Sequence, residues 1–253
     1  MSWCDKLAST PGVGIKLDRH YVSGHAILDA ISPILDTWAD GEKQKFVIDK
    51  DESFILALTT DNGFHYGIEP TRIHVTFNHR MQPKPISGGP PVLEMLSSPL
   101  PYSELLPEVS KRLSEVTLLV PGVKTRTVTR VGVISSTLVA NDELPPGIAR
   151  FIKYISRPWD CLPENYSIHI TTELDKTADW SDRCIHLIHK PEDSEQLLTL
   201  RFDWQRLFTI GHAITPDSLK EILTTAEKAS TKYFEDIAEG NMFDEEIIVS
   251  RAT

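Results

Sequence analysis

The order of secondary-structure signals repeats along this chain, and the repetition constrains its fold more than any other feature. Residues 12–117 and 126–238 each predict a strand, a helix, two or three further strands and a closing amphipathic helix. A helix with one apolar stripe must bury that stripe against a sheet or another helix. The sequence therefore predicts an α+β protein of two similar lobes, each strand-helix-strands-helix, with helices packed on mainly antiparallel sheets.

The first half begins with a predicted strand over residues 12–17 and a helix that Ser23 caps and Pro33 interrupts. The tripeptide Asp-Asn-Gly at residues 61–63 favours a hairpin, because these residues tolerate positive φ. Three further strands are expected at residues 45–50, 53–59 and 72–79. The last of these alternates apolar and polar residues, which is typical of a strand with one buried and one wet face.

Residues 82–101 carry six prolines and two adjacent glycines. Proline lacks the backbone N–H that helices and sheets use, so this segment is expected to be an exposed, flexible linker. The expected domains are an N-terminal α+β lobe over residues 1–101 that includes this linker, a C-terminal α+β lobe over residues 102–239, and an acidic tail over residues 240–253. A helix at residues 103–117 lies close to the boundary.

The second half predicts a central strand at residues 125–139 and a helix that ends near Arg157. Three strands are expected next, at residues 167–173, 183–190 and 197–204. The last helix has the clearest ends, since Thr215 suits the N-cap, Pro216 suits the first helical position and Gly240 suits the stop. This long helix is expected to pack across a sheet.

Charge and cysteine content limit the classes of function. The chain has 26 basic and 36 acidic residues, a net charge of −10, which makes nucleic acid an unexpected partner. Lys124, Arg126 and Arg130 are interpreted as a solvated strand edge, with Arg130 directed into a polar pocket. Three unpaired cysteines, no signal sequence and no long apolar run predict a cytoplasmic protein with no membrane segment.

No motif in the sequence carries a specific chemistry. Gly12-Val13-Gly14 lacks the third glycine of a dinucleotide loop and is interpreted as a turn. Cys184 and His186 share a strand face that His169 could approach, but the spacing matches no common zinc framework, so no metal or other cofactor is expected. The carboxylates between Glu173 and Asp182 are interpreted as a solvated loop. No residue is assigned a catalytic role.

Polar residues on the exposed faces of the predicted sheets are the candidate binding residues. If the helices cover the apolar faces, both halves display histidine and arginine on the opposite face, and an open polar face can serve as a docking platform. Replacement of any one of these solvent-exposed histidines by alanine is expected to leave the fold intact. The candidates are Arg72, His74, Asn78, His169, His186, Arg201 and Asp203.

The stretch Thr129-Arg130-Val131-Gly132-Val133 resembles the Arg-x-Gly strand motif of a sporadically distributed family of uncharacterised bacterial proteins, and residues 215–237 resemble that family's closing helix. The resemblance implies a prokaryotic accessory role without an assigned activity. The favoured function is a non-enzymatic binding or adaptor subunit of a bacterial protein assembly, in antiviral defence or regulation, with another protein subunit as partner. Alternatives are a hydrolase or nuclease with a His/Asp/Glu site, and a small-molecule binder with a helix-closed cavity.

Overall fold

A computed structural model describes residues 3–7, 9–18, 24–38, 45–49, 55–60, 62–69, 71–79, 81–86, 89–95, 100–140, 143–159, 164–190 and 197–240. The first half contains β1 (Thr10–Leu17), α1 (Gly24–Trp38), β2 (Lys45–Asp49), β3 (Ile55–Thr59), β4 (Phe64–Glu69), β5 (Arg72–Phe77), β6 (Met81–Ile86), β7 (Gly89–Met95) and α2 (Tyr102–Leu119). The second half contains β8 (Thr127–Ala140), α3 (Pro146–Ser156), β9 (Tyr166–Lys176), β10 (Trp180–Lys190), β11 (Leu197–Ala213) and α4 (Pro216–Glu239).

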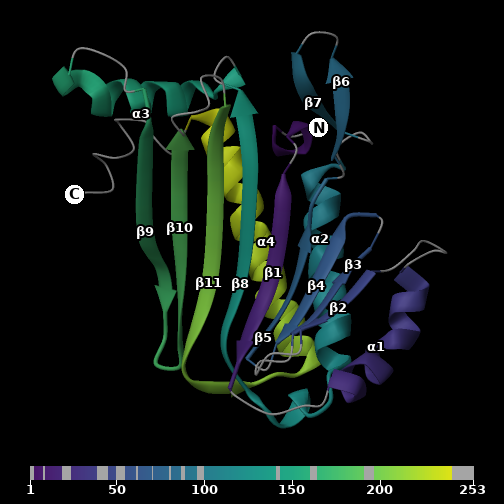
Figure 1. Ribbon diagram of the computed structural model, residues 1–253. Helices are drawn as coiled ribbons and strands as arrows, with labels where there is room; N and C mark the ends of the chain where they lie inside the picture. The colour runs from purple at the N-terminus through teal and green to yellow at the C-terminus, as the bar shows by residue number, and fades with distance from the viewer. Residues whose placement is uncertain are drawn as a thin grey trace.

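Nine strands form one antiparallel sheet in the order β2-β3-β4-β5-β1-β8-β11-β10-β9 (Figure 1). In each half the first strand pairs with the last strand that the half contributes to this sheet, β1 with β5 and β8 with β11. The halves join at the centre, where β1 pairs with β8 and Val13 lies opposite Val133. The α+β class with helices on an antiparallel sheet is confirmed. The halves share this one sheet instead of each having its own, and their similarity stays a prediction.

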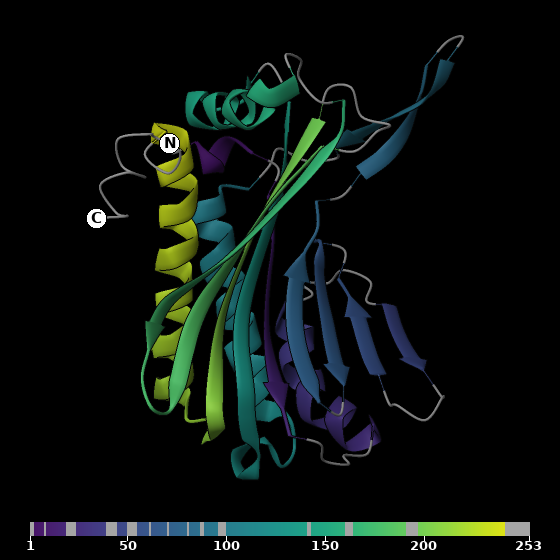
Figure 2. The ribbon, with the colours of Figure 1, turned by 90° about the vertical axis from the view of Figure 1, so that its left-hand side faces the viewer.

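The long helices α2 and α4 lie on the same side of the sheet (Figure 2). Helix α1 contacts α2 and β3, whereas α3 contacts α4 and crosses one end of the second-half strands (Figure 1). Alternation along the central strands turns Val13, Val133 and Trp204 towards the helices, where each is at most 1% exposed. Each such side chain contributes about 1.5–3 kcal/mol by leaving water. The core therefore lies between the sheet and the helices.

Helix α4 begins and ends as its sequence predicts. The Thr215 side chain accepts a hydrogen bond from the backbone N–H of Ser218, and the Ser218 hydroxyl accepts one from the backbone N–H of Thr215. Pro216 occupies the first turn, and Gly240 ends the helix with φ of 80°. Glycine adopts this left-handed conformation without the strain that other residues carry, which explains why the helix stops there.

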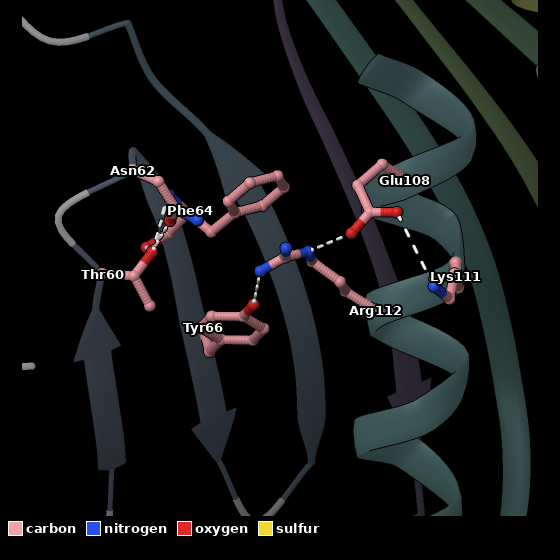
Figure 3. A network of polar contacts seen from close by, with 7 residues as sticks. All are labelled: Thr60, Asn62, Phe64, Tyr66, Glu108, Lys111 and Arg112. Carbon is pink, nitrogen blue, oxygen red and sulfur yellow. Dashed lines mark hydrogen bonds and ion pairs between the residues drawn. The ribbon is translucent and has the colours of Figure 1, made fainter. Parts of the chain in front are cut away.

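A polar network ties α2 to the first half of the sheet (Figure 3). The Arg112 Nε donates to Glu108 over 2.6 Å, and its Nη1 donates to the Tyr66 hydroxyl on β4 over 2.8 Å. The same guanidinium lies 3.7 Å from the centre of the Phe64 ring. Burial raises the pKa of Tyr66 to about 12, so its hydroxyl stays protonated and accepts the bond. The network therefore links α2 to β4.

The proline-rich segment corrects one prediction. Residues 82–101 were expected to form no regular structure, yet β6 and β7 pair as an antiparallel hairpin that projects from the body of the protein (Figure 2). Pro83 and Pro85 are two positions apart in β6, so the backbone nitrogens of both can face away from β7, where no N–H donor is needed. Gly12 and Gly14, interpreted as a turn, belong to strand β1. Ser23 and the predicted tail beyond Gly240 lie outside the described residues.

Strand β11 runs to Ala213, nine residues past the predicted end at residue 204, and pairs there with Thr127 at the start of β8. No helix in the described part of the chain is long and apolar enough to cross a lipid bilayer.

Candidate ligand site on the open face of the sheet

The face of the sheet that points away from α2 and α4 contains a depression of about 480 Å³ above the central strands. Its bottom is formed by Gly12 and Gly14 of β1 and Gly132 of β8. Gly14 and Gly132 lie directly opposite each other in the β1–β8 pair. We call these three residues the glycine floor. Strand β5 on one side and β11 on the other carry the side chains that form its walls.

His74 on the β5 wall leans away from the glycine floor. A Cβ atom built on Gly67 of β4 would lie 2.1 Å from the His74 Cε1, so the imidazole rests directly on this glycine. A Cβ on Gly14 would lie 3.2 Å from the His74 Cβ and 3.7 Å from its Cα, and both atoms are nearer than any atom of the ring. Burial, followed by the nearby Arg72 charge, lowers the pKa of His74, so its ring is neutral near pH 7. Gly67 thus provides the space that keeps the floor uncovered.

Cations surround the depression although the whole chain is acidic. The lining includes Lys16, Arg72, Arg130 and Arg201 against a single carboxylate, Asp203. Arg72 forms an ion pair with Glu69 at 2.9 Å. Among the described residues, Lys16 and Arg130 form no ion pair. The depression is therefore locally positive, which favours an anionic ligand.

Asp203 is held at the β11 wall by its neighbours. The Gln205 amide nitrogen donates to both Asp203 carboxylate oxygens at 3.0 Å, and Arg183 donates to the Gln205 amide oxygen at 2.8 and 3.1 Å. Burial raises the pKa of Asp203, while this Gln205 bond and the nearby arginines oppose the rise. Arg201 lies 4.0 Å from Asp203, and its side chain is 44% exposed. Arg201 is accordingly free to turn towards a ligand.

A second depression of about 240 Å³ adjoins the first on the same face. It is lined by His169 of β9 and by Ile185 and Leu187 of β10, and it shares Arg201 and Asp203 with the larger depression. The two hollows meet at these shared side chains. The open face thus offers a continuous surface from β5 to β9.

The structure brings four of the predicted binding residues together in the larger depression: Arg72, His74, Arg201 and Asp203. His169 lines the adjoining one. Asn78 is exposed just beyond the end of β5 and lines neither.

The prediction that His186 belongs to the binding site on the exposed face is wrong, because this side chain faces the helices. It lies opposite Phe202 in the β10–β11 pair, and its ring centre is 5.0 Å from that of Tyr233 on α4. Since side chains alternate along β10, Leu187 and not His186 shares a face with Arg201. His186 therefore lies on the helix side of the sheet, on the face opposite to His169 and Asp203, with which a His/Asp/Glu hydrolase site would combine it.

The same alternation separates the potential zinc ligands. Cys184 and His186 point towards α4, whereas His169 points to the open face. Cys184 is 2% exposed, and burial, followed by the charges of Asp182 and Asp203, raises the pKa of its thiol to about 12. No group of three metal-ligating side chains occurs among the residues that the structure describes.

The binding residues predicted from the sequence did not include the glycine floor, Lys16 or Gln205. Glycines at positions 12 and 14 of one strand and at 132 of another give a signal, because alternate residues of a strand share one face. Pairing of β1 with β8, which joins them, is not visible in the sequence. Arg130 was interpreted as pointing into a polar pocket, and it does line the depression.

The chain matches no protein-family model, no curated protein and no solved structure. The resemblance to a bacterial family is not tested by these comparisons and stays a prediction.

Proposed function

We propose that this protein is a non-enzymatic binding subunit that docks an acidic segment of another protein on the open face of its sheet. The observation that carries the proposal is the charge distribution. A chain with ten more acidic than basic residues places four cations and one carboxylate around the depression. Such segregation steers an anionic partner to this face and sets its orientation. Membership of a bacterial defence or regulatory assembly is part of the same proposal.

A protein segment suits the site better than a small ligand closed in by α4. The depression lies on the opposite side of the sheet from that helix, so the helix does not close it. The neighbouring hollow extends the surface towards β9, which favours an elongated partner. A sheet face that is open on one side and packed on the other is rigid, and rigid surfaces bind with little loss of conformational entropy.

Arg130 is the best residue for testing the proposal. Charge reversal at Arg72 or Arg201 also breaks a pair with Glu69 or Asp203, whereas Arg130 forms no ion pair with any residue that the structure describes. The measurement is fluorescence anisotropy of a labelled peptide of ten glutamates at low and moderate salt. Arg130→Glu should weaken binding by at least about tenfold, equivalent to ~1.4 kcal/mol, and flatten the salt dependence.

Lys220→Glu is the matched control, since Lys220 is exposed on α4, which packs on the other side of the sheet. It makes the same change in net charge and should leave binding unchanged. Equal losses from both variants would show that only net charge matters and would refute this site. A single-stranded oligonucleotide that binds more tightly than the peptide would instead make nucleic acid the partner. A pull-down from the native cell with an Arg72→Glu/Arg201→Glu variant complements this assay.

A further inference from the structure

The centre of the depression is apolar, and its charges lie at the rim. The glycine floor exposes backbone without side chains, and the neighbouring Ile134 side chain is 36% exposed on the same face. Lys16 and Arg130 lie opposite each other at one end of the floor. Protein interfaces place their strongest contacts in such an apolar centre and surround it with a polar rim.

Gly132 is the least crowded residue of the glycine floor, although the Trp204 backbone would have to shift by a few tenths of an ångström to accept a side chain there. A Cβ at this position would meet only the Trp204 carbonyl oxygen at 3.3 Å and the Gln205 Cγ at 3.8 Å. Gly12 differs, because its Cβ would lie 2.8 Å from the Thr76 Cγ2. Glycine weakens a strand interior, and there it often marks a site where a ligand or another backbone approaches closely. Gly132 therefore leaves room for a ligand.

The depression is broad. From β5 to β11 there are three strand spacings, about 14 Å, and from residue 12 to residue 16 of β1 about 13 Å. A flat group fits such a space better than a branched one. Among side chains, aromatic rings combine a flat shape, a large apolar area and few rotatable bonds.

We infer that the acidic partner segment lays an aromatic side chain flat on the glycine floor, while carboxylates on either side of it reach the rim cations. This inference rests on the proposed function and specifies the motif that it recognises. In an extended segment, residues i and i+2 point the same way about 7 Å apart. Acidic residues two positions before and after the ring can therefore reach the walls while the ring fills the centre. The leaning position of His74 keeps that centre uncovered.

Three labelled peptides test the motif by fluorescence anisotropy: Asp-Glu-Trp-Glu-Asp, Asp-Glu-Ala-Glu-Asp and Lys-Lys-Trp-Lys-Lys. The tryptophan-containing acidic peptide should bind wild-type protein about tenfold more tightly than its alanine counterpart, and the basic peptide should not bind. Gly132→Val fills the floor and should abolish the preference for tryptophan. Ser136→Val is the matched control, because Ser136 lies on the same face of β8 but does not line the depression.

The possible results separate this inference from the proposed function. Equal binding of both acidic peptides, with both lost in Arg130→Glu, would leave the docking function standing and overturn the aromatic contact. Binding of neither acidic peptide would overturn both. Retention of the tryptophan preference in Gly132→Val would also overturn the placement on the floor. Thermal unfolding checks each variant, and if Gly132→Val does not fold, Gly132→Ala should still reduce the preference about threefold.

Discussion

Replacing Arg112 with alanine is expected to lower the free energy of unfolding by about 3 kcal/mol. The side chain is 9% exposed and bridges α2 to β4 through Glu108 and the Tyr66 hydroxyl (Figure 3). It also covers the Phe64 ring. Helix α2 packs on β1 and β5, which supply part of the floor and one wall of the open-face depression, so the change also tests what supports that site.

The magnitude follows from three contacts. The charged hydrogen bond to the Tyr66 hydroxyl is worth about 1.5–3 kcal/mol, and the cation–π contact with Phe64 about 1–2 kcal/mol. The bond to Glu108 adds less than about 1 kcal/mol, because that carboxylate is 37% exposed to water. Returning the guanidinium to water offsets part of the sum, since its burial costs desolvation energy. A net loss of about 3 kcal/mol remains.

Urea denaturation followed by circular dichroism measures the loss. With a slope near 3 kcal/mol per molar urea, the midpoint should fall by about 1 M. Lys111→Ala is the control, because Lys111 is the adjacent residue, 63% exposed and 4.0 Å from the same Glu108. It should change stability by less than about 0.5 kcal/mol. If Arg112→Ala and Lys111→Ala unfold at the same urea concentration, the network does not support the fold as described.

Three further predictions concern side chains that are partly or fully buried. Burial lowers the pKa of His186 below 6.5, so as the pH falls the unfolded state binds the proton before the folded state does. The free energy of unfolding should therefore decrease as the pH drops from 7 to 5. Denaturation at each pH should show a smaller decrease in His186→Gln. Tyr102→Phe should lose only about 1 kcal/mol in urea denaturation, because the Ser135 and Ser230 hydroxyls that bond to Tyr102 also bond to each other; a larger loss would contradict this. The Cys184 thiol, with its raised pKa, should react with a thiol reagent only after unfolding, and rapid labelling of the native protein would disprove its burial.

Local features of the chain were predictable where neighbouring residues decide the structure. Thr215, Pro216 and Gly240 set the ends of α4, and alternation in residues 72–79 identified β5 with its buried and exposed faces. These signals depend on backbone conformation and on period, both of which a short stretch contains. The α+β class follows from them.

The sequence by itself thus determined most elements and placed arginine and histidine on exposed faces, but it did not determine which faces meet. Joining of the halves through β1 and β8 creates the glycine floor and brings Arg72 near Arg201, 129 positions apart in the sequence. A shift of one residue in strand register would exchange the faces of Leu187, which lies on the open face, and His186, which lies on the helix side. Pairing and register are set by burial of whole faces across distant strands, and only the tertiary structure decides them.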